Sequence, residues 1–273
     1  MSAVAASTLR SLAIDLGRAF AGALIFSLPM LMTMEMWELG LYMDRWRLLL
    51  LLFLSFPTLM FLSHYSGFER TWGWREDLRD VGVAYGIALV ASTVVMLLLS
   101  ILQPGMSPSE IVGKLALQAV PAALGALLAR SQLGQESGKD QSDEGYGGEL
   151  GVMAVGALFL SLNIAPTEEM VLISHRMTAW QSMLLLALSI LVMHGFVYAT
   201  EFKGSSAVPR GTPLWHLLLR FTLVGYVLGL CISLYALWTF SRLDGLSFGQ
   251  VVGAVIVLGF PASVGAAAAR LIL

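Results

Sequence analysis

The segment Leu162-Asn-Ile-Ala-Pro-Thr-Glu-Glu-Met170 places two adjacent glutamates inside a long apolar run. A related segment, Leu28-Pro-Met-Leu-Met-Thr-Met-Glu-Met36, occurs 134 positions earlier. Identical residues align within these segments and beyond them: Leu28 with Leu162, Thr33 with Thr167, Glu35 with Glu169, Met36 with Met170, Met43 with Met177 and Trp46 with Trp180. A charged side chain at the centre of a membrane-spanning helix costs at least about 2.5 kcal/mol. The repeated carboxylate therefore indicates either a functional site or a repeated structural requirement.

The composition predicts an all-α, polytopic helical membrane protein. Hydrophobic residues make up 57% of the 273 residues and charged residues only 12%, and the mean hydropathy is +0.78. A soluble domain is usually about 25% charged. Runs of roughly 20 apolar residues, each long enough to cross a bilayer core of about 30 Å, recur along the chain. The lipid bilayer is thus the expected environment, and no basic cluster suits nucleic acid.

The apolar runs and the breaks between them predict about eight transmembrane helices. The expected spans are approximately 16–39, 48–65, 81–102, 110–128, 150–173, 181–200, 214–240 and 248–271. Residues 131–149 are mostly Gly, Ser, Gln, Asp and Glu, a composition typical of a flexible linker. We therefore expect a first four-helix repeat at 1–130, a cytoplasmic linker at 131–149 and a second four-helix repeat at 150–273.

Further matches support a duplication. Pro121–Arg130 aligns with Pro261–Arg270 at an offset of 140. Single positions follow the same order: Gly105, Ser107 and Gly113 align with Gly245, Ser247 and Gly253, and Tyr85 aligns with Tyr226 at an offset of 141. An even number of spans per repeat brings both repeats into the membrane from the same side. The repeats would then be parallel, with a pseudo-two-fold axis along the membrane normal.

The distribution of basic residues predicts a cytoplasmic location for both termini, because cytoplasmic loops carry an excess of Lys and Arg. With the N-terminus inside, the inner segments hold 11 of the 16 basic residues: Arg10, Arg18, Arg70, Arg75, Arg79, Arg130, Lys139, Lys203, Arg210, Arg220 and Arg270. The outer segments and nearby span ends hold the other 5: Arg45, Arg47, Lys114, Arg176 and Arg242.

The functional interpretation of the acids is a proton or cation site. Glu35 lies 17 residues beyond Arg18, or about 25 Å of helix, which would place it in the outer third of the membrane. Two close carboxylates cannot both stay ionised cheaply, so they share a proton or hold a cation. Oxygen ligands suit hard cations. The candidate site comprises Glu35, Glu169, Glu168, Asn163, Thr167 and Thr33, with Glu38 and His194 as secondary candidates.

A structural interpretation of the same residues stays open. Pro166-Thr-Glu-Glu169 also resembles a helix start, with a threonine N-cap and acids in the first turn, where the helix dipole favours them. A second structural interpretation pairs the acids with an outer arginine: Arg45, Arg47 or Arg176. His194 lies deep in an expected span, where it is either a hydrogen-bonded packing residue or a ligand. The other histidines, His64, His175 and His216, lie near span ends and are given no role.

Several enzyme classes are excluded by missing motifs. The chain has no phosphate-binding G-x-x-x-x-G-K-[ST] loop, no H-E-x-x-H zinc motif and no G-x-S-x-G nucleophile motif. It has one cysteine, Cys231, so paired-cysteine metal sites are also excluded. We expect no enzymatic activity and no cofactor.

The segments Leu28-Pro-Met-Leu-Met-Thr-Met-Glu-Met-Trp37 and Ala165-Pro-Thr-Glu-Glu169 resemble the hallmark segments of a bacterial family of integral membrane proteins of unknown function. The resemblance covers most of the chain and implies a multi-pass protein of the bacterial inner membrane. It implies no activity. Two functional hypotheses follow from the residues: a transporter or channel-like protein for protons or small cations, and a membrane scaffold, sensor or assembly factor with structural acids. Both are compatible with an oligomer.

Overall fold

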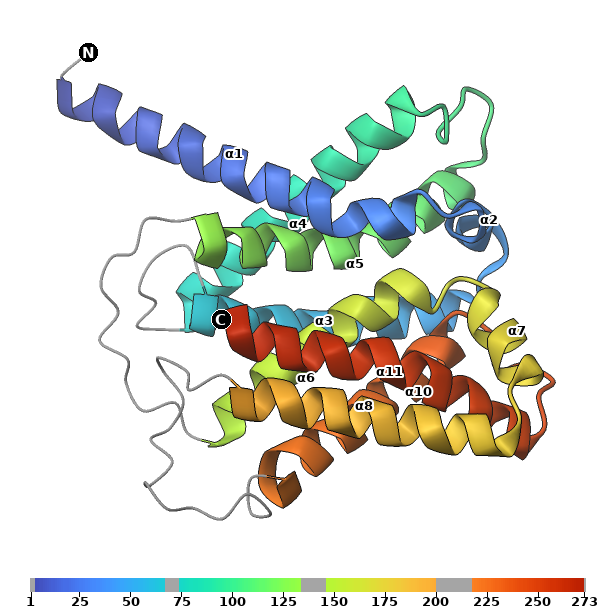
Figure 1. Ribbon diagram of the computed structural model, residues 1–273. Coiled ribbons are helices and arrows are strands. Elements are labelled where there is room, and N and C mark those ends of the chain that lie inside the picture. Colours follow the sequence, from blue (N-terminus) through green and yellow to red (C-terminus); the bar gives the residue numbers. More distant parts are fainter. Residues whose placement is uncertain (1–2, 67–73, 134–145, 200–217, 273) are drawn as a thin grey trace. The chain divides into compact units, whose positions relative to one another are not determined.

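The computed structural model describes residues 3–66, 74–133, 146–199 and 218–272 (Figure 1). These residues form helices joined by short connections, and no strand occurs among them. The chain divides into two compact units, residues 1–135 and 136–273. Each unit is described separately below.

The first unit is built around one central helix. Its elements are α1 (Ala3–Leu31), α2 (Met34–Tyr42), α3 (Arg45–Ser66), α4 (Trp74–Leu98) and α5 (Pro108–Leu133). Helix α5 packs against α1, α2, α3 and α4, and its side chains are the most buried of the four long helices in this unit. The short helix α2 follows α1 and packs mainly on α5.

The second unit contains a helix with the same central role. Its elements are α6 (Tyr146–Ile164), α7 (Glu169–Arg176), α8 (Ala179–Ala199), the π-helix η1 (Leu218–Leu223), α10 (Val224–Thr239) and α11 (Phe248–Ile272). Helix α11 packs against α6, α7, α8 and α10, and Figure 1 shows it in red alongside α6 and α8. The short helix α7 follows α6 as α2 follows α1.

Glycine pairs bring two helix backbones into direct contact in each unit. A Cβ atom on Gly125 of α5 would lie 2.5 Å from the Gly22 carbonyl oxygen of α1. A Cβ atom on Gly265 of α11 would lie 2.3 Å from the Gly156 carbonyl oxygen of α6. Only glycine fits at such distances, and small residues of this kind let helices approach closely within a bilayer.

The connections that precede α5 and α11 have the same backbone conformation. Ser100 and Ser241 have positive φ angles of 57° and 61°, and Gly105 and Gly245 have positive φ angles of 97° and 78°. Ser100 and Ser241 lie two residues beyond the ends of α4 and α10, and Gly105 and Gly245 lie later in the two connections. The loops therefore reverse the chain in the same way in both units.

Within the described ranges, eight helical stretches are long and apolar enough to cross a membrane. The candidate spans start at Leu12, Arg45, Trp74, Pro108, Tyr146, Ala179, Leu218 and Phe248, in agreement with the expected number and order. Residues 67–73 and 200–217, between expected spans, lie outside the described residues. The predicted linker at 131–149 is helical at 131–133 and 146–149, and residues 134–145 also lie outside the described residues.

Two of the predicted spans are too long. The span expected at 16–39 ends at Leu31, and the span expected at 150–173 ends at Ile164. In the first unit the chain becomes extended at Thr33, with φ −91° and ψ 137°. In the second unit Pro166 lacks an N–H group and disfavours helical geometry in the preceding residue. Apolar sequence continues past both breaks, so hydropathy alone did not reveal them.

We expect Gly22→Ala and Gly156→Ala to destabilise the protein. The new Cβ atom would lie 2.4 Å from the Gly125 carbonyl oxygen in the first case and 2.2 Å from the Gly265 carbonyl oxygen in the second. Overpacking of this kind typically costs about 1–3 kcal/mol. Thermal unfolding in detergent measures the effect. Gly86→Ala is the matched control, since no heavy atom lies within 4 Å of its Cβ position. Equal melting temperatures for all three variants would contradict the contact.

Candidate functional site

The repeated glutamates lie on the short helices and not within the long spans. Glu35 is in the first turn of α2 and is half-buried, and Glu169 is the first residue of α7 and is exposed. Both lie outside the candidate membrane spans, which end at Leu31 and Ile164. The expectation that Glu35 lies within one unbroken helix from 16 to 39 is therefore wrong, because that helix ends at Leu31. The first turn of a helix favours a carboxylate because of the helix dipole.

The threonines before the glutamates close the preceding helices. The Thr33 hydroxyl donates a hydrogen bond to the Met30 carbonyl oxygen at 2.7 Å, and the Thr167 hydroxyl donates to the Ile164 carbonyl oxygen at 2.9 Å. Neither short helix has a side-chain hydrogen bond at its N-cap. The expected capping by threonine is thus wrong, although the acids do occupy the first turn. The two breaks share this threonine hydrogen bond, but the N-cap residue is the extended Thr33 in the first unit and the helical Glu168 in the second.

Glu168 and Asn163, which the sequence placed in the candidate site, have other partners. Arg242, from the connection between α10 and α11, donates to Glu168 Oε1 through Nη1 at 3.1 Å and to the Pro166 carbonyl oxygen through Nε at 2.7 Å. Asn163 is buried in the last turn of α6 and donates to the Phe159 carbonyl oxygen at 2.9 Å. The glutamate next to Glu169 is therefore an ion-paired residue that anchors the start of α7.

A buried ion pair occupies the corresponding region of the first unit. Lys114 Nζ lies 2.9 Å from Glu110 Oε1, and the side chains are 5% and 19% exposed. Lys114 also donates to the Ile101 carbonyl oxygen at 3.4 Å, which attaches the connection before α5 to that helix. Sequence analysis gave no role to Lys114 or to Arg242. The i,i+4 spacing of Glu110 and Lys114 was a signal for the first pair.

Three glutamates on the short helices have no ion pair or side-chain hydrogen bond among the described residues: Glu35, Glu38 and Glu169. Arg45, an expected partner, instead binds carbonyl oxygens at the end of α2 and the Ser109 hydroxyl of α5. Within the described ranges, no three His, Cys, Asp or Glu side chains gather into a group that could hold a metal ion. Any cation bound to Glu35 or Glu169 would therefore need further oxygen ligands from hydroxyl groups, backbone or water.

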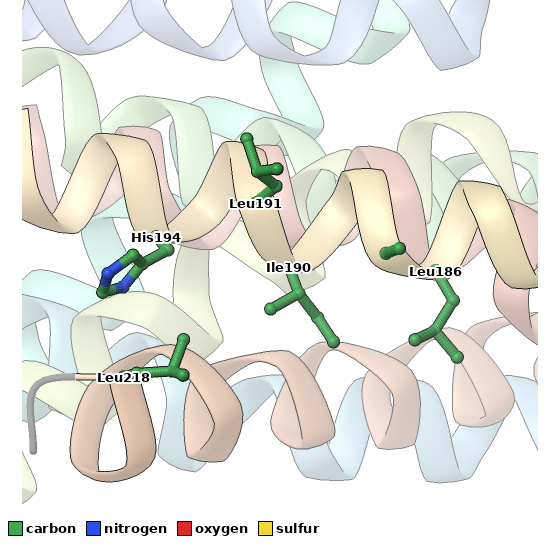
Figure 2. A pocket seen from close by; sticks show the side chains of 6 residues that line it. Leu186, Ile190, Leu191, His194 and Leu218 are labelled. Atoms are coloured by element: carbon green, nitrogen blue, oxygen red, sulfur yellow. The ribbon is translucent and has the colours of Figure 1, made fainter. Parts of the chain in front are cut away.

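His194 lies near the C-terminal end of α8, and α7 with Glu169 precedes the other end of that helix. Its Nδ1 atom is 2.9 Å from the Thr222 hydroxyl oxygen in η1. Figure 2 shows the imidazole at one end of a groove between α8 and η1, with Leu186, Ile190 and Leu218 along it. The groove has a volume of about 400 Å³, and His194 is its one polar lining side chain. The contact with Thr222 and the apolar neighbours agree with the interpretation of His194 as a hydrogen-bonded packing residue.

The helices and their connections define a polytopic α-helical membrane protein. The chain belongs to the family described as "Putative integral membrane protein (DUF2391)", which matches residues 15–273. This match confirms the resemblance to a family of integral membrane proteins. No curated protein and no solved structure matches the chain. The protein is thus a multi-pass integral membrane protein in contact with lipid, and its site has to be interpreted from its own residues.

We expect Arg242→Ala to lower the stability of the second unit more than Glu168→Gln does. Arg242 is 12% exposed and also satisfies the buried Pro166 carbonyl, whereas Glu168 is 77% exposed. An unsatisfied buried acceptor costs about 1–3 kcal/mol, and an exposed ion pair contributes about 0–1 kcal/mol. Thermal unfolding of the two variants in detergent measures the difference. A larger loss in Glu168→Gln would show that the ion pair, and not the carbonyl contact, holds the loop.

Proposed function

We propose that this protein moves protons or small cations across the bacterial inner membrane, as a transporter or channel, and that Glu35 and Glu169 bind them. The observation that carries the proposal is that two of the glutamates have a cationic partner and two others have none. Glu110 and Glu168 are neutralised by Lys114 and Arg242. Glu35 and Glu169, at aligned positions, have no such partner among the described residues. A carboxylate that no side chain neutralises is available to a proton or a cation.

Similarities between the two units support the interpretation that Glu35 and Glu169 are equivalent residues of a duplicated four-span unit. The close crossings at Gly22 and Gly156 involve residues 134 positions apart. A serine of the second span also lies near a tyrosine of the next one in both units. Ser55 and the Tyr85 hydroxyl are hydrogen-bonded, and Ser189 lies near Tyr226, although the Tyr226 hydroxyl has no hydrogen bond of normal geometry among the described residues. If the units arose by duplication, Glu35 and Glu169 occupy equivalent positions, each within its own unit.

The membrane orientation that we propose places the acids near the outer surface. The excess of basic residues in the expected inner segments supports cytoplasmic termini. Trp46 and Trp180 begin α3 and α8 on the side where α2 and α7 lie, and their side chains are largely exposed. Tryptophan is enriched at the boundary between lipid and water. Glu35 and Glu169 would therefore be reached from the external solvent.

The chemistry near each glutamate suits a weakly held, hard cation or a proton. The Thr33 and Thr167 hydroxyl groups donate to carbonyl oxygens, so their own oxygen atoms can still act as acceptors. Carboxylate, hydroxyl and carbonyl oxygens are the ligands that hard cations prefer. The positive end of the helix dipole favours the ionised carboxylate when no cation is bound. Binding that is favourable but weak is what conduction requires.

We expect Glu35→Gln and Glu169→Gln each to reduce proton or cation flux in proteoliposomes at least tenfold. The amide keeps the size of the side chain and removes its charge. Glu38→Gln is the control, because Glu38 lies on the same short helix but has no acid at the aligned position of the second unit, which is Leu172. Flux is measured with a pH-sensitive dye, and with Na⁺ or K⁺ gradients in parallel. Normal flux in both variants would refute the site.

The second candidate function is a non-transport scaffold, sensor or assembly factor. The ion pair between Glu168 and Arg242 favours it, because that acid has a structural partner. The first-turn positions of Glu35 and Glu169 also favour it, since they stabilise helices without any ligand. In this case Glu35→Gln and Glu169→Gln would lower the melting temperature, and no ion would raise the melting temperature of the wild type.

A further inference from the structure

A histidine on α7 is held by a glutamine of α11. His175 Nε2 lies 2.8 Å from Gln250 Nε2, and His175 Nδ1 lies 2.7 Å from the Val171 carbonyl oxygen. Gln250 Oε1 accepts hydrogen bonds from the Ser247 backbone N–H at 2.8 Å and from the Ser247 hydroxyl at 2.9 Å. Ser247 and Gln250 thereby cap the start of α11. The network links α7 to the first turn of the helix on which it packs.

The hydrogen-bond partners in this network determine which nitrogen of His175 carries a proton. The Ser247 backbone N–H can only donate, so the atom of Gln250 that faces it must be the carbonyl oxygen. The Gln250 amide nitrogen therefore faces His175 and donates to Nε2, which must be unprotonated. The Val171 carbonyl can only accept, so the imidazole proton is on Nδ1. The contact between α7 and α11 thus requires neutral His175.

We propose that His175 is a pH-sensitive switch that holds α7 against α11 near neutral pH and releases it as the external side becomes acidic. Histidine side chains gain their charge between about pH 8 and pH 5. A proton on Nε2 would face the two donor hydrogens of the Gln250 amide. Gln250 cannot turn its oxygen toward the imidazolium without giving up both hydrogen bonds to Ser247. The contact therefore depends on an unprotonated Nε2 atom and is broken when that atom gains a proton.

The charged groups around α7 do not replace the lost contact. Helix α11 has no charged residue before Arg270, so it offers the imidazolium no carboxylate. On α7 itself the charged residues are Glu169, at the opposite end, and Arg176, next to the histidine. The connection between α10 and α11 contributes Arg242 and Asp244. The C-terminal dipole of α7 favours a positive charge on His175, but this interaction lies within α7 and does not attach it to α11.

The first unit offers an internal control. Leu41 aligns with His175 and Glu110 aligns with Gln250. Glu110 is paired with Lys114. Helix α2 therefore has no titratable group at the position of the switch, although it packs on α5 as α7 packs on α11. External acid would therefore release α7 and leave α2 in place. Any effect of this release on ion binding at Glu169 rests on the proposed function.

Amide hydrogen exchange of the full-length protein in lipid nanodiscs, read by mass spectrometry at pH 7.5 and 5.5, tests the switch. An eight-residue helix is not stable by itself, so protection of the α7 amides reports its packing on α11. After correction for intrinsic exchange, we expect the α7 amides to exchange roughly fivefold faster at pH 5.5, which corresponds to the loss of one hydrogen bond. We expect α2 to change little.

His175→Gln is the matched variant, because its side-chain oxygen can accept from Gln250 and does not titrate. We expect its α7 exchange to be the same at both pH values. Equal α7 exchange in the wild type at pH 7.5 and 5.5, or the same rise in His175→Gln, would overturn the proposal. The readout does not need transport, so normal flux in Glu35→Gln and Glu169→Gln would refute the transport site and leave the switch standing.

Discussion

The helix breaks after Leu31 and Ile164 are the constraint on which the candidate site depends. A helix end near lipid leaves carbonyl groups that need hydrogen-bond partners. In the first unit the Trp37 indole donates to the Leu31 carbonyl oxygen at 2.8 Å, in addition to the threonine bond described above. In the second unit Arg242 binds the Pro166 carbonyl. These side chains make the breaks stable, and the breaks move the acids from the spans onto short helices.

The central helices determine where those short helices lie. Helices α5 and α11 touch the first helix of their unit backbone to backbone at Gly125 and Gly265. Each central helix also packs against the short helix of its own unit, α5 against α2 and α11 against α7. In α2, Gly40 meets Lys114 of α5, and in α7, Ser174 meets Gly253 of α11. Close packing of small residues thus positions α2 and α7 without any contribution from the acids that they carry.

Cationic partners are distributed unevenly among the glutamates near the helix breaks. A buried cation needs a partner, because an unpaired charge away from water is costly. Lys114 and Arg242 meet this need with Glu110, with Glu168 and with backbone carbonyls. Glu35 and Glu169 have no such partner among the described residues. The proposed ion site would account for these two acids, and so would a structural role in the first turn of a short helix.

The sequence by itself determined the class of protein, the number and order of the spans, and the repeated acids, because long apolar runs and residue identities are local properties. It did not predict the end of the first span at Leu31, since apolar residues continue past the break. It also did not predict that Glu168 binds Arg242, 74 residues away, or that His175 binds Gln250, 75 residues away. Such contacts depend on how α7, α10 and α11 pack. Only the tertiary structure decides them, because a polar side chain takes whichever partner the packing brings within hydrogen-bond distance.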